Sequence, residues 1–363
     1  MAKVKAAVVE APGKISIQEF PFPEVSKEDG LLKVDMVGVC GSDPKYFYGR
    51  FAHRRNFPLI LGHEIVGTIA KVGSEAAKRW GVQEGDRVVV EGSFGCGYCP
   101  MCLAGAYRLC KNSLGYGNRI AADVPPHLWG GFSEYLYLAP QAIVHKIDPE
   151  VTLEAGSLIC AVIANGVRWV EAGGVRFGDV VVVQGVGAQG LALITAAKES
   201  GAAIVIAAGL ARDRDRLKMA LTLGADYAIN VEEKDLLEVV AEITHGNLAD
   251  VVFDVTGSTA APKISFEIVK PLGRIVQAGL NGGKMVPLEL DKIVWKEVSV
   301  QGVYSYDYRS VKAAIKLVES RKYPLDKIVT HYFKLEEAET ALKATAGEIE
   351  LPGLIKAVIV PIY

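Results

Sequence analysis

The chain has 363 residues, half of them hydrophobic, which is too long for one ordinary core and fits two domains. Its 40 basic and 42 acidic residues give a formal net charge of −2. This balance excludes the basic surplus that is typical of proteins that bind nucleic acid or an anionic membrane.

Short β-like runs separated by glycine and proline fill about the first 155 residues. Their spacing predicts an antiparallel, barrel-like domain. The runs are residues 5–9, 31–39, 64–72, 86–91 and 132–138.

From about residue 175 the pattern changes to alternating strands and helices, which predicts a parallel, doubly wound sheet. The expected strands are residues 180–184, 204–207, 227–230, 251–255, 274–278 and 298–303. The expected helices are residues 188–200, 214–223, 235–244, 260–269 and 310–320. A final apolar strand, 354–360, has no helix after it, so we expect it to return to the sheet of the first domain. The second domain would then be inserted into the first.

Four cysteines lie within fifteen residues: Cys96, Cys99, Cys102 and Cys110. The loop around them, about 92–115, is rich in glycine. Four thiolates at this spacing form a closed tetrahedral zinc site, which leaves no position for a substrate. An iron–sulfur cluster could use the same ligands, but nothing else in the sequence indicates electron transfer. We therefore expect a structural zinc ion in this lobe.

The cysteines also bear on the cellular compartment. The first ten residues lack the apolar core of a signal peptide, and no apolar run approaches the roughly 18–20 residues needed to span a bilayer. Adjacent CxxC pairs in a chain without an export signal indicate metal ligands rather than disulfides. We expect a cytoplasmic protein.

A GxGxxG turn follows the valine-rich strand 180–184 and opens a helix. In this context the pattern predicts a dinucleotide site, because the glycines let the backbone approach a pyrophosphate at the helix N-terminus. The alternative is a tight turn without a ligand. The residues assigned to the site are Gly185, Gly187, Ala188 and Gly190, with Gly279 after strand 274–278.

The end of the second parallel strand indicates which nicotinamide cofactor is bound. An NAD site usually places a carboxylate there, about 20 residues after the turn, to hold the ribose. This chain has Gly209 at that position, with Arg212 and Arg214 close by. The pattern favours NADP. Asp213 and Asp215 leave NAD open, since a shifted turn could bring either carboxylate to the ribose.

Three further residues could bind a metal: Cys40, His63 and Cys160. Each alone has a simpler interpretation, because a buried cysteine is usually core and a lone histidine is usually a hydrogen-bonded polar side chain. Together they supply two thiolates and an imidazole. That set matches a catalytic zinc site with an open fourth position.

With these residues in place, the sequence resembles the zinc-containing medium-chain alcohol dehydrogenases over nearly its full length. The resemblance rests on Cys-Gly-Ser-Asp at 40–43, Gly-His-Glu at 62–64, the four-cysteine lobe and the GxGxxG turn. It implies an α/β fold in which a GroES-like β-barrel catalytic domain, 1–160 and 306–363, encloses a Rossmann cofactor domain, 161–305.

The resemblance also implies roles for single residues. Ser42 would bond the substrate oxygen and begin the proton relay, and Asp43 would orient the His63 ring. Glu64 would approach the zinc ion as water and substrate exchange. Lys356 would occupy the basic position that the family uses toward the pyrophosphate.

The proton relay contains one departure from the family pattern. Relatives often carry histidine five residues after the first cysteine ligand, and this chain has Lys45 there. A lysine passes a proton only where its surroundings make the ammonium more acidic. Either Lys45 does so, or the proton leaves by another path such as His53 or water.

The expected reaction is hydride transfer between NAD(P) and an alcohol or the matching carbonyl compound, with two zinc ions per chain. Two groups of aromatic residues favour a secondary, apolar or cyclic alcohol as substrate. The first follows the Cys40 motif, and the second precedes a strand that lines the cleft in the family: Tyr46, Phe47, Tyr48 and Phe51, then Trp129 and Phe132. They could equally be core. The alternative is a polyol, sugar or amino-alcohol dehydrogenase, and a catalytically inactive structural protein is a remote one. We expect a homodimer or homotetramer that binds neither nucleic acid nor membrane.

Overall fold

The computed structural model describes residues 3–51 and 57–362. The chain divides into two compact units. The first contains residues 1–161 and 307–363, and the second contains residues 162–306. The sequence placed each boundary one residue earlier.

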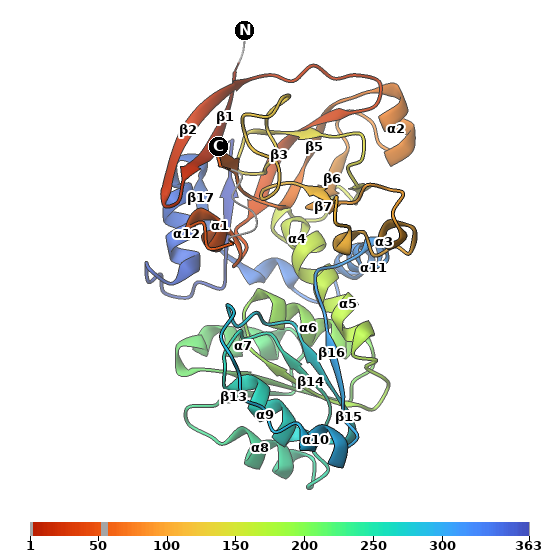
Figure 1. Ribbon diagram of the computed structural model, residues 1–363, viewed down its shortest axis with the longest axis vertical. Coiled ribbons are helices and arrows are strands. Elements are labelled where there is room, and N and C mark those ends of the chain that lie inside the picture. Colours follow the sequence, from red (N-terminus) through yellow and green to blue (C-terminus); the bar gives the residue numbers. More distant parts are fainter. Residues whose placement is uncertain (1–2, 52–56, 363) are drawn as a thin grey trace. The chain divides into compact units, whose positions relative to one another are not determined.

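The first unit is built on a mostly antiparallel seven-stranded sheet in the order β10-β6-β5-β3-β18-β17, with β9 paired to β3 (Figure 1). Its strands are β3 Gly30–Gly38, β5 Glu64–Val72, β6 Arg87–Val90, β9 Tyr135–Leu138, β10 Val144–Lys146, β17 Val329–Lys334 and β18 Lys356–Val360. A three-stranded sheet contains β1 Lys3–Ala11, β2 Lys14–Pro21 and β4 Leu59–Ile60. The expected antiparallel domain is confirmed.

The last strand returns to the first unit, as expected. β18 pairs antiparallel with β3, and Val358 lies opposite Gly38. β17, which the sequence did not predict, adds a parallel strand beyond it. The C-terminal segment therefore completes the sheet whose other strands come from the N-terminal part of the chain.

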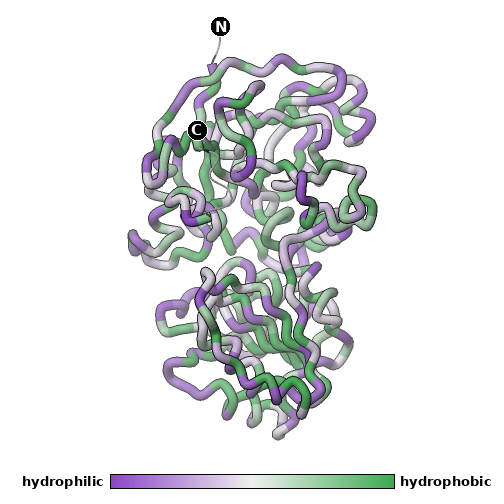
Figure 2. Tube along the Cα trace, viewed as in Figure 1, coloured by the Kyte–Doolittle hydropathy of each residue, from purple (hydrophilic) through white to green (hydrophobic). Residues whose placement is uncertain are grey.

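The second unit is a six-stranded parallel sheet in the order β13-β12-β11-β14-β15-β16. Its strands are β11 Val180–Gln184, β12 Ile204–Gly209, β13 Tyr227–Asn230, β14 Ala249–Asp254, β15 Val269–Gln277 and β16 Ser299–Gly302. The helices between them are α6 Ala188–Glu199, α7 Arg214–Thr222, α8 Leu236–Ile243, α9 Ala261–Ile268 and α10 Asp291–Trp295. Figure 2 shows the hydrophobic residues of this unit gathered in the strands. The expected doubly wound fold is confirmed.

One apolar helical run was not expected from the sequence. Residues 153–172 are continuous through α4 Leu153–Leu158, a π-helical turn Ile159–Ile163 and α5 Ala164–Ala172. The run is long and apolar enough to cross a membrane, yet 78% of its most apolar window is buried inside the fold. Burial accounts for its composition, as in a core helix of a soluble protein.

The sequence also missed several short elements of the first unit. These are α1 Asp43–Phe47, α2 Ser74–Trp80, α3 Pro100–Leu103, β7 Ser93–Phe94, β8 Leu114–Gly115 and α12 Ala338–Ala346, besides β2 and β4. The helix expected at 310–320 is α11 Tyr308–Glu319. All of the missed elements except α12 and β2 have seven residues or fewer, which is too short for hydrophobic periodicity to identify.

Candidate active and cofactor sites

Neighbouring strands bring together a thiol, an imidazole and a carboxylate. Cys40 lies just beyond the end of β3, and His63 and Glu64 stand at the start of β5. Because β3 and β5 are antiparallel, with Gly38 opposite Glu64, these positions meet at one end of the sheet. The ligand atoms of the three residues all lie within 4.8 Å of one another. One soft and two harder donors at this separation fit a zinc ion.

Asp43 holds the imidazole of this group. Its Oδ1 lies 3.3 Å from Nδ1 of His63, and its Oδ2 accepts a hydrogen bond of 2.8 Å from the Cys40 backbone N–H. Burial acts to lower the pKa of His63, but the carboxylate of Asp43 and the thiol of Cys40 outweigh it and raise that pKa well above its usual value. The local charge is thus negative and suits a cation.

Cys160, which the sequence analysis assigned as the third zinc ligand, is not one of the three residues in this group. Cys160 lies in the π-helical turn and is 1% exposed. Burial, with a contribution from the Glu91 carboxylate, raises the pKa of its thiol well above the usual value. Among the described residues, the third donor beside Cys40 and His63 is Glu64, and the assignment of Cys160 as a ligand stays a prediction.

Lys356, which the sequence analysis assigned to the cofactor pyrophosphate, has its side chain buried in the first unit. Its ammonium pairs with the Glu64 carboxylate and donates a hydrogen bond of 3.0 Å to the Val39 carbonyl. Burial acts to lower the pKa of Lys356, and the charge of Glu64 more than compensates and raises it. Lys356 therefore positions Glu64.

Ser42 stands beside the metal group at the N-cap of α1. Its hydroxyl does not cap that helix, and it has no hydrogen-bond partner within residues 3–51 and 57–362. The hydroxyl is consequently available to a ligand. Lys45 lies one turn further along α1 and is half-buried. His53, the other relay candidate, lies outside the described residues.

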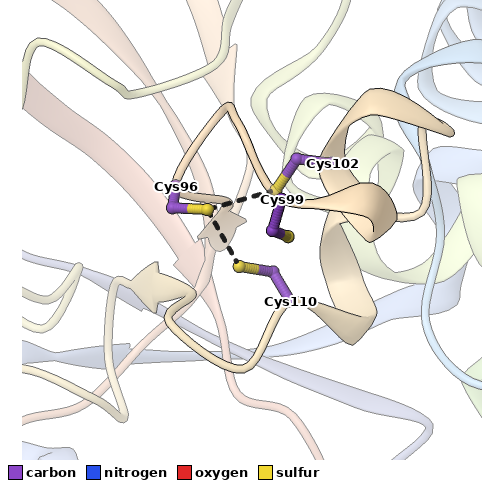
Figure 3. Close-up of side chains that lie close together, drawn as sticks. All are labelled: Cys96, Cys99, Cys102 and Cys110. Carbon is purple, nitrogen blue, oxygen red and sulfur yellow. Dashed lines mark hydrogen bonds between the residues drawn. The ribbon is translucent and has the colours of Figure 1, made fainter.

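The four lobe cysteines converge, as the sequence predicted. Figure 3 shows their side chains around one small space, with all four sulfur atoms within 4.8 Å of one another. Cys96 Sγ lies 3.6 Å from Cys110 Sγ and 3.9 Å from Cys102 Sγ. Tetrahedral zinc with Zn–S bonds of about 2.3 Å separates its sulfurs by about 3.8 Å, so the group fits the ion.

Short helices and one buried hydrogen bond position the cysteines of this lobe. Cys102 lies in α3 and Cys99 is its N-cap, Cys110 follows the short 3-10 helix Tyr107–Leu109, and Cys96 lies in the preceding loop. The Tyr107 hydroxyl donates a hydrogen bond of 2.5 Å to the buried Glu91 carboxylate, which ties the lobe to the sheet. Backbone N–H groups led by that of Tyr98 lower the pKa of Cys96 to about 6, which favours its thiolate.

The glycine-rich turn of the second unit lines a pocket of about 350 Å³. Gly185 and Gly187 form its floor, and Gly209 lies at the end of the next strand. Gly190 and Gly279 act by packing, because a Cβ on Gly190 would lie 1.8 Å from the Gly185 carbonyl and one on Gly279 would lie 2.5 Å from the Gly257 nitrogen. Ala188 begins α6, whose N-terminus follows the turn. The arrangement suits a pyrophosphate.

The arginines that line this pocket differ in one residue from the pair expected from the sequence, Arg212 and Arg214. Arg212 and Arg216 line it, whereas Arg214 does not. Arg216 follows Asp213 by three residues and so shares its face of the helix, a spacing that could have identified it. Asp213 is occupied: its Oδ1 pairs with Arg216 at 2.9 Å and its Oδ2 accepts from the Leu210 N–H at 3.1 Å. Arg212 has no partner among the described residues.

The aromatic residues that favoured an apolar substrate belong to the core. Phe47 and Phe132 are fully buried, and Tyr46 and Trp129 nearly so. Tyr48 and Phe51 pack against the same cluster. Their position explains their hydrophobicity without a substrate.

Known protein families match the sequence of both units. Residues 26–149 match a family model described as an alcohol dehydrogenase GroES-like domain, and residues 188–320 match one described as a zinc-binding dehydrogenase. A probable alcohol dehydrogenase of Mycobacterium tuberculosis is 39% identical over 99% of both chains. An erythritol/L-threitol dehydrogenase of Mycolicibacterium smegmatis is 33% identical over 95% of both.

Solved structures share the whole architecture. An alcohol dehydrogenase from Thermotoga maritima superposes with a TM-score of 0.90, 27% identity and full coverage of both chains. A zinc-binding dehydrogenase from Sinorhizobium meliloti, bound to NADP, gives a TM-score of 0.88 and 26% identity, covering 99% of this chain and 100% of that one. The likeness therefore extends over both units.

Proposed function

The chain belongs to the zinc-containing medium-chain dehydrogenases and is an oxidoreductase, and we propose that it interconverts a secondary alcohol group of a small polyol and the matching ketone with a nicotinamide cofactor. The observation that carries this proposal is the group of Cys40, His63 and Glu64, with the unengaged hydroxyl of Ser42 beside it. It provides a cation site and a polar contact for a substrate oxygen in one place.

Two zinc ions per chain are proposed. Cys40, His63 and Glu64 would hold the catalytic one, and the four lobe cysteines would hold the structural one. The catalytic zinc supplies Lewis acidity, which lowers the cost of removing the alcohol proton. The protein's part is to fix the donors: Asp43 orients His63, and Lys356 holds Glu64.

Ser42 would receive a hydrogen bond from the alcohol and take part in removing its proton. Its hydroxyl can donate and accept at once, so it can pass a proton onward. Lys45 is the nearest described basic residue further along α1 and remains our candidate for the next step. The alternative is transfer to water.

Two observations favour a polyol over the apolar or cyclic alcohol that the sequence predicted. The aromatic side chains behind that expectation pack in the core. Proteins that are 30–33% identical over 93–96% of either chain include erythritol/L-threitol and sorbitol dehydrogenases. The apolar or cyclic secondary alcohol is the second candidate, and the 39% identical relative is named only as a probable alcohol dehydrogenase.

NADP is the proposed cofactor, with NAD as the alternative. A 2′-phosphate at the end of β12 would meet the unpartnered Arg212 and the side chain of Arg216. Asp213 would not repel it, because its carboxylate is already neutralised by Arg216 and by a backbone N–H. The pocket thus favours an added negative charge.

A second copy of the chain is the proposed partner. β16 is an edge strand, and all four of its residues are exposed. Exposed apolar residues lie on and before it: Met285, Leu290, Val294, Trp295 and Val300. An open strand edge beside such a patch is usually covered, and a twofold axis would pair β16 with its copy. Light scattering of Trp295→Glu should show monomers in place of the wild-type dimer or tetramer.

A reducing compartment such as the cytoplasm is proposed for the protein. All six cysteines are free, and four of them form a metal-fitting group rather than disulfides.

The proposed function is tested by a substrate panel with NAD and NADP in parallel. Purified protein with measured zinc content should reduce NADP in the presence of small polyols and fail to do so once both metals are removed. Turnover of neither polyols nor simple secondary alcohols by zinc-loaded protein would refute the proposal.

A further inference from the structure

Buried polar atoms without a hydrogen-bond partner are concentrated near the metal group. Among the described residues of the first unit they belong mostly to Asp43, His63 and Glu64, where Asp43 Oδ1 lies 3.3 Å from His63 Nδ1 and the Glu64 carboxylate pairs with Lys356. One further case is Asn118 Oδ1, in a side chain that is 9% exposed. Folded proteins leave few such atoms unpaired, so each needs a physical explanation.

Asn118 stands next to the metal group through a glycine contact. Gly117 packs on Gly62, the residue before His63, so closely that a Cβ on Gly117 would lie 2.6 Å from the Gly62 carbonyl oxygen. Both glycines have positive φ, 76° and 89°, which a larger residue rarely adopts. Asn118 directly follows Gly117, and His63 directly follows Gly62. The Cα atoms of consecutive residues are about 3.8 Å apart, so Asn118 and His63 each lie one residue from this contact.

The amide of Asn118 has no structural task within residues 3–51 and 57–362. It caps no helix and joins no hydrogen-bond network there. A leucine of similar size would fill the same space without leaving a polar atom unpaired. A buried amide without a hydrogen bond lowers the stability of the fold. Such an amide close to a metal group is typical of a group that bonds a ligand.

We propose that Asn118 binds a second hydroxyl of the substrate, next to the one that is oxidised. An uncharged amide offers both a donor and an acceptor, which matches a hydroxyl and does not match a carboxylate or a cation. The inference rests on the proposed function, because it names what makes a polyol a better substrate than a monohydric alcohol at the same site.

The test compares a vicinal butanediol with the corresponding secondary butanol, which differ in one hydroxyl. In Asn118→Leu, kcat/KM for the diol should fall about 10- to 100-fold, the range for a lost hydrogen bond to a buried polar group, while that for the monohydric alcohol stays within a few-fold of wild type. The melting temperature of the variant should be unchanged or higher, since an unpaired polar atom has been removed.

Thr345→Val is the matched control. It removes a buried hydroxyl on α12 that has no partner among the described residues, and it should leave the preference for the diol unchanged. An equal loss for both alcohols in Asn118→Leu, or a lower melting temperature with an unchanged preference, would show a structural role and overturn the inference.

Calorimetric binding of the two alcohols separates this inference from the proposed function. Tighter binding of the diol that is lost in Asn118→Leu would support the contact even if neither alcohol were oxidised. Equal binding of the two alcohols by wild type would overturn it.

Discussion

Lys356, in the last strand of the chain, forms a buried ion pair with Glu64, which lies within 4.8 Å of Cys40 and His63. The C-terminal strand therefore does more than complete the sheet. It brings a fixed positive charge to the carboxylate that we propose as a metal ligand. Because a buried charge is costly without its partner, loss of either residue should disturb the site.

Metal content distinguishes Glu64 from Cys160 as the third ligand. After dialysis against a chelator, wild type and Cys160→Ala should each retain close to two zinc equivalents, whereas Glu64→Gln should fall toward one, because an amide is a weaker zinc ligand than a carboxylate. Elemental analysis measures this. If Cys160→Ala loses a zinc ion and Glu64→Gln keeps both, the assignment made from the sequence is right.

Removal of a lobe thiolate should act on stability. Cys102→Ser opens the four-thiolate site, whose metal binding contributes folding free energy, so the melting temperature should fall by about 5–10 °C and one zinc equivalent should be lost. Calorimetry with zinc analysis is the measurement. Cys160→Ala provides a buried cysteine outside the lobe for comparison, and an unchanged melting temperature and zinc content in Cys102→Ser would contradict the lobe assignment.

Two neighbouring arginines test the choice of cofactor. Arg212→Ala should raise KM for NADP about ten- to a hundredfold and leave KM for NAD nearly unchanged, because a charge-assisted hydrogen bond to the 2′-phosphate is worth roughly 1.5–3 kcal/mol. Arg214→Ala is the control, since that side chain does not line the pocket. A wild-type preference for NAD would mean that Arg212 faces solvent in the complex. Gly209→Asp is a poor test, because a Cβ there would lie 2.7 Å from Val186.

The hydroxyl of Ser42 should matter for turnover and not for folding. It has no hydrogen-bond partner among the described residues, so Ser42→Ala should keep the melting temperature and both zinc ions while kcat falls by roughly 10²–10⁴-fold, the range for general acid–base contributions. Lys45→Ala should shift the pH–rate profile if that residue carries the proton onward. A profile identical to wild type would place the path through water.

The elements that sequence reasoning found are those with a strong local pattern. Strands such as β11 are valine-rich and end at a glycine turn. The spacing of the four lobe cysteines along the sequence is itself typical of a metal site. Both patterns can be recognised from the sequence because each is confined to a short stretch of chain.

What the sequence missed depends on contacts between distant segments. The proposal of Glu64 as a ligand depends on the pairing of β3 with β5 and on the ion pair with Lys356, and no local sequence pattern contains either. Cys160 was assigned as a ligand by residue type, and it lies buried in a π-helical turn that the sequence did not predict. The unpaired amide of Asn118 is visible only once its surroundings are known.

The central claim is that the metal group of the first unit drives polyol oxidation, and zinc removal with reconstitution tests it most directly. Reduction of NADP by a polyol panel is followed in wild type, in protein stripped by a chelator, and after zinc is restored. The account predicts that stripping abolishes reduction and that zinc restores it in wild type but not in Ser42→Ala or Glu64→Gln. Undiminished reduction by protein shown to contain no zinc would contradict it.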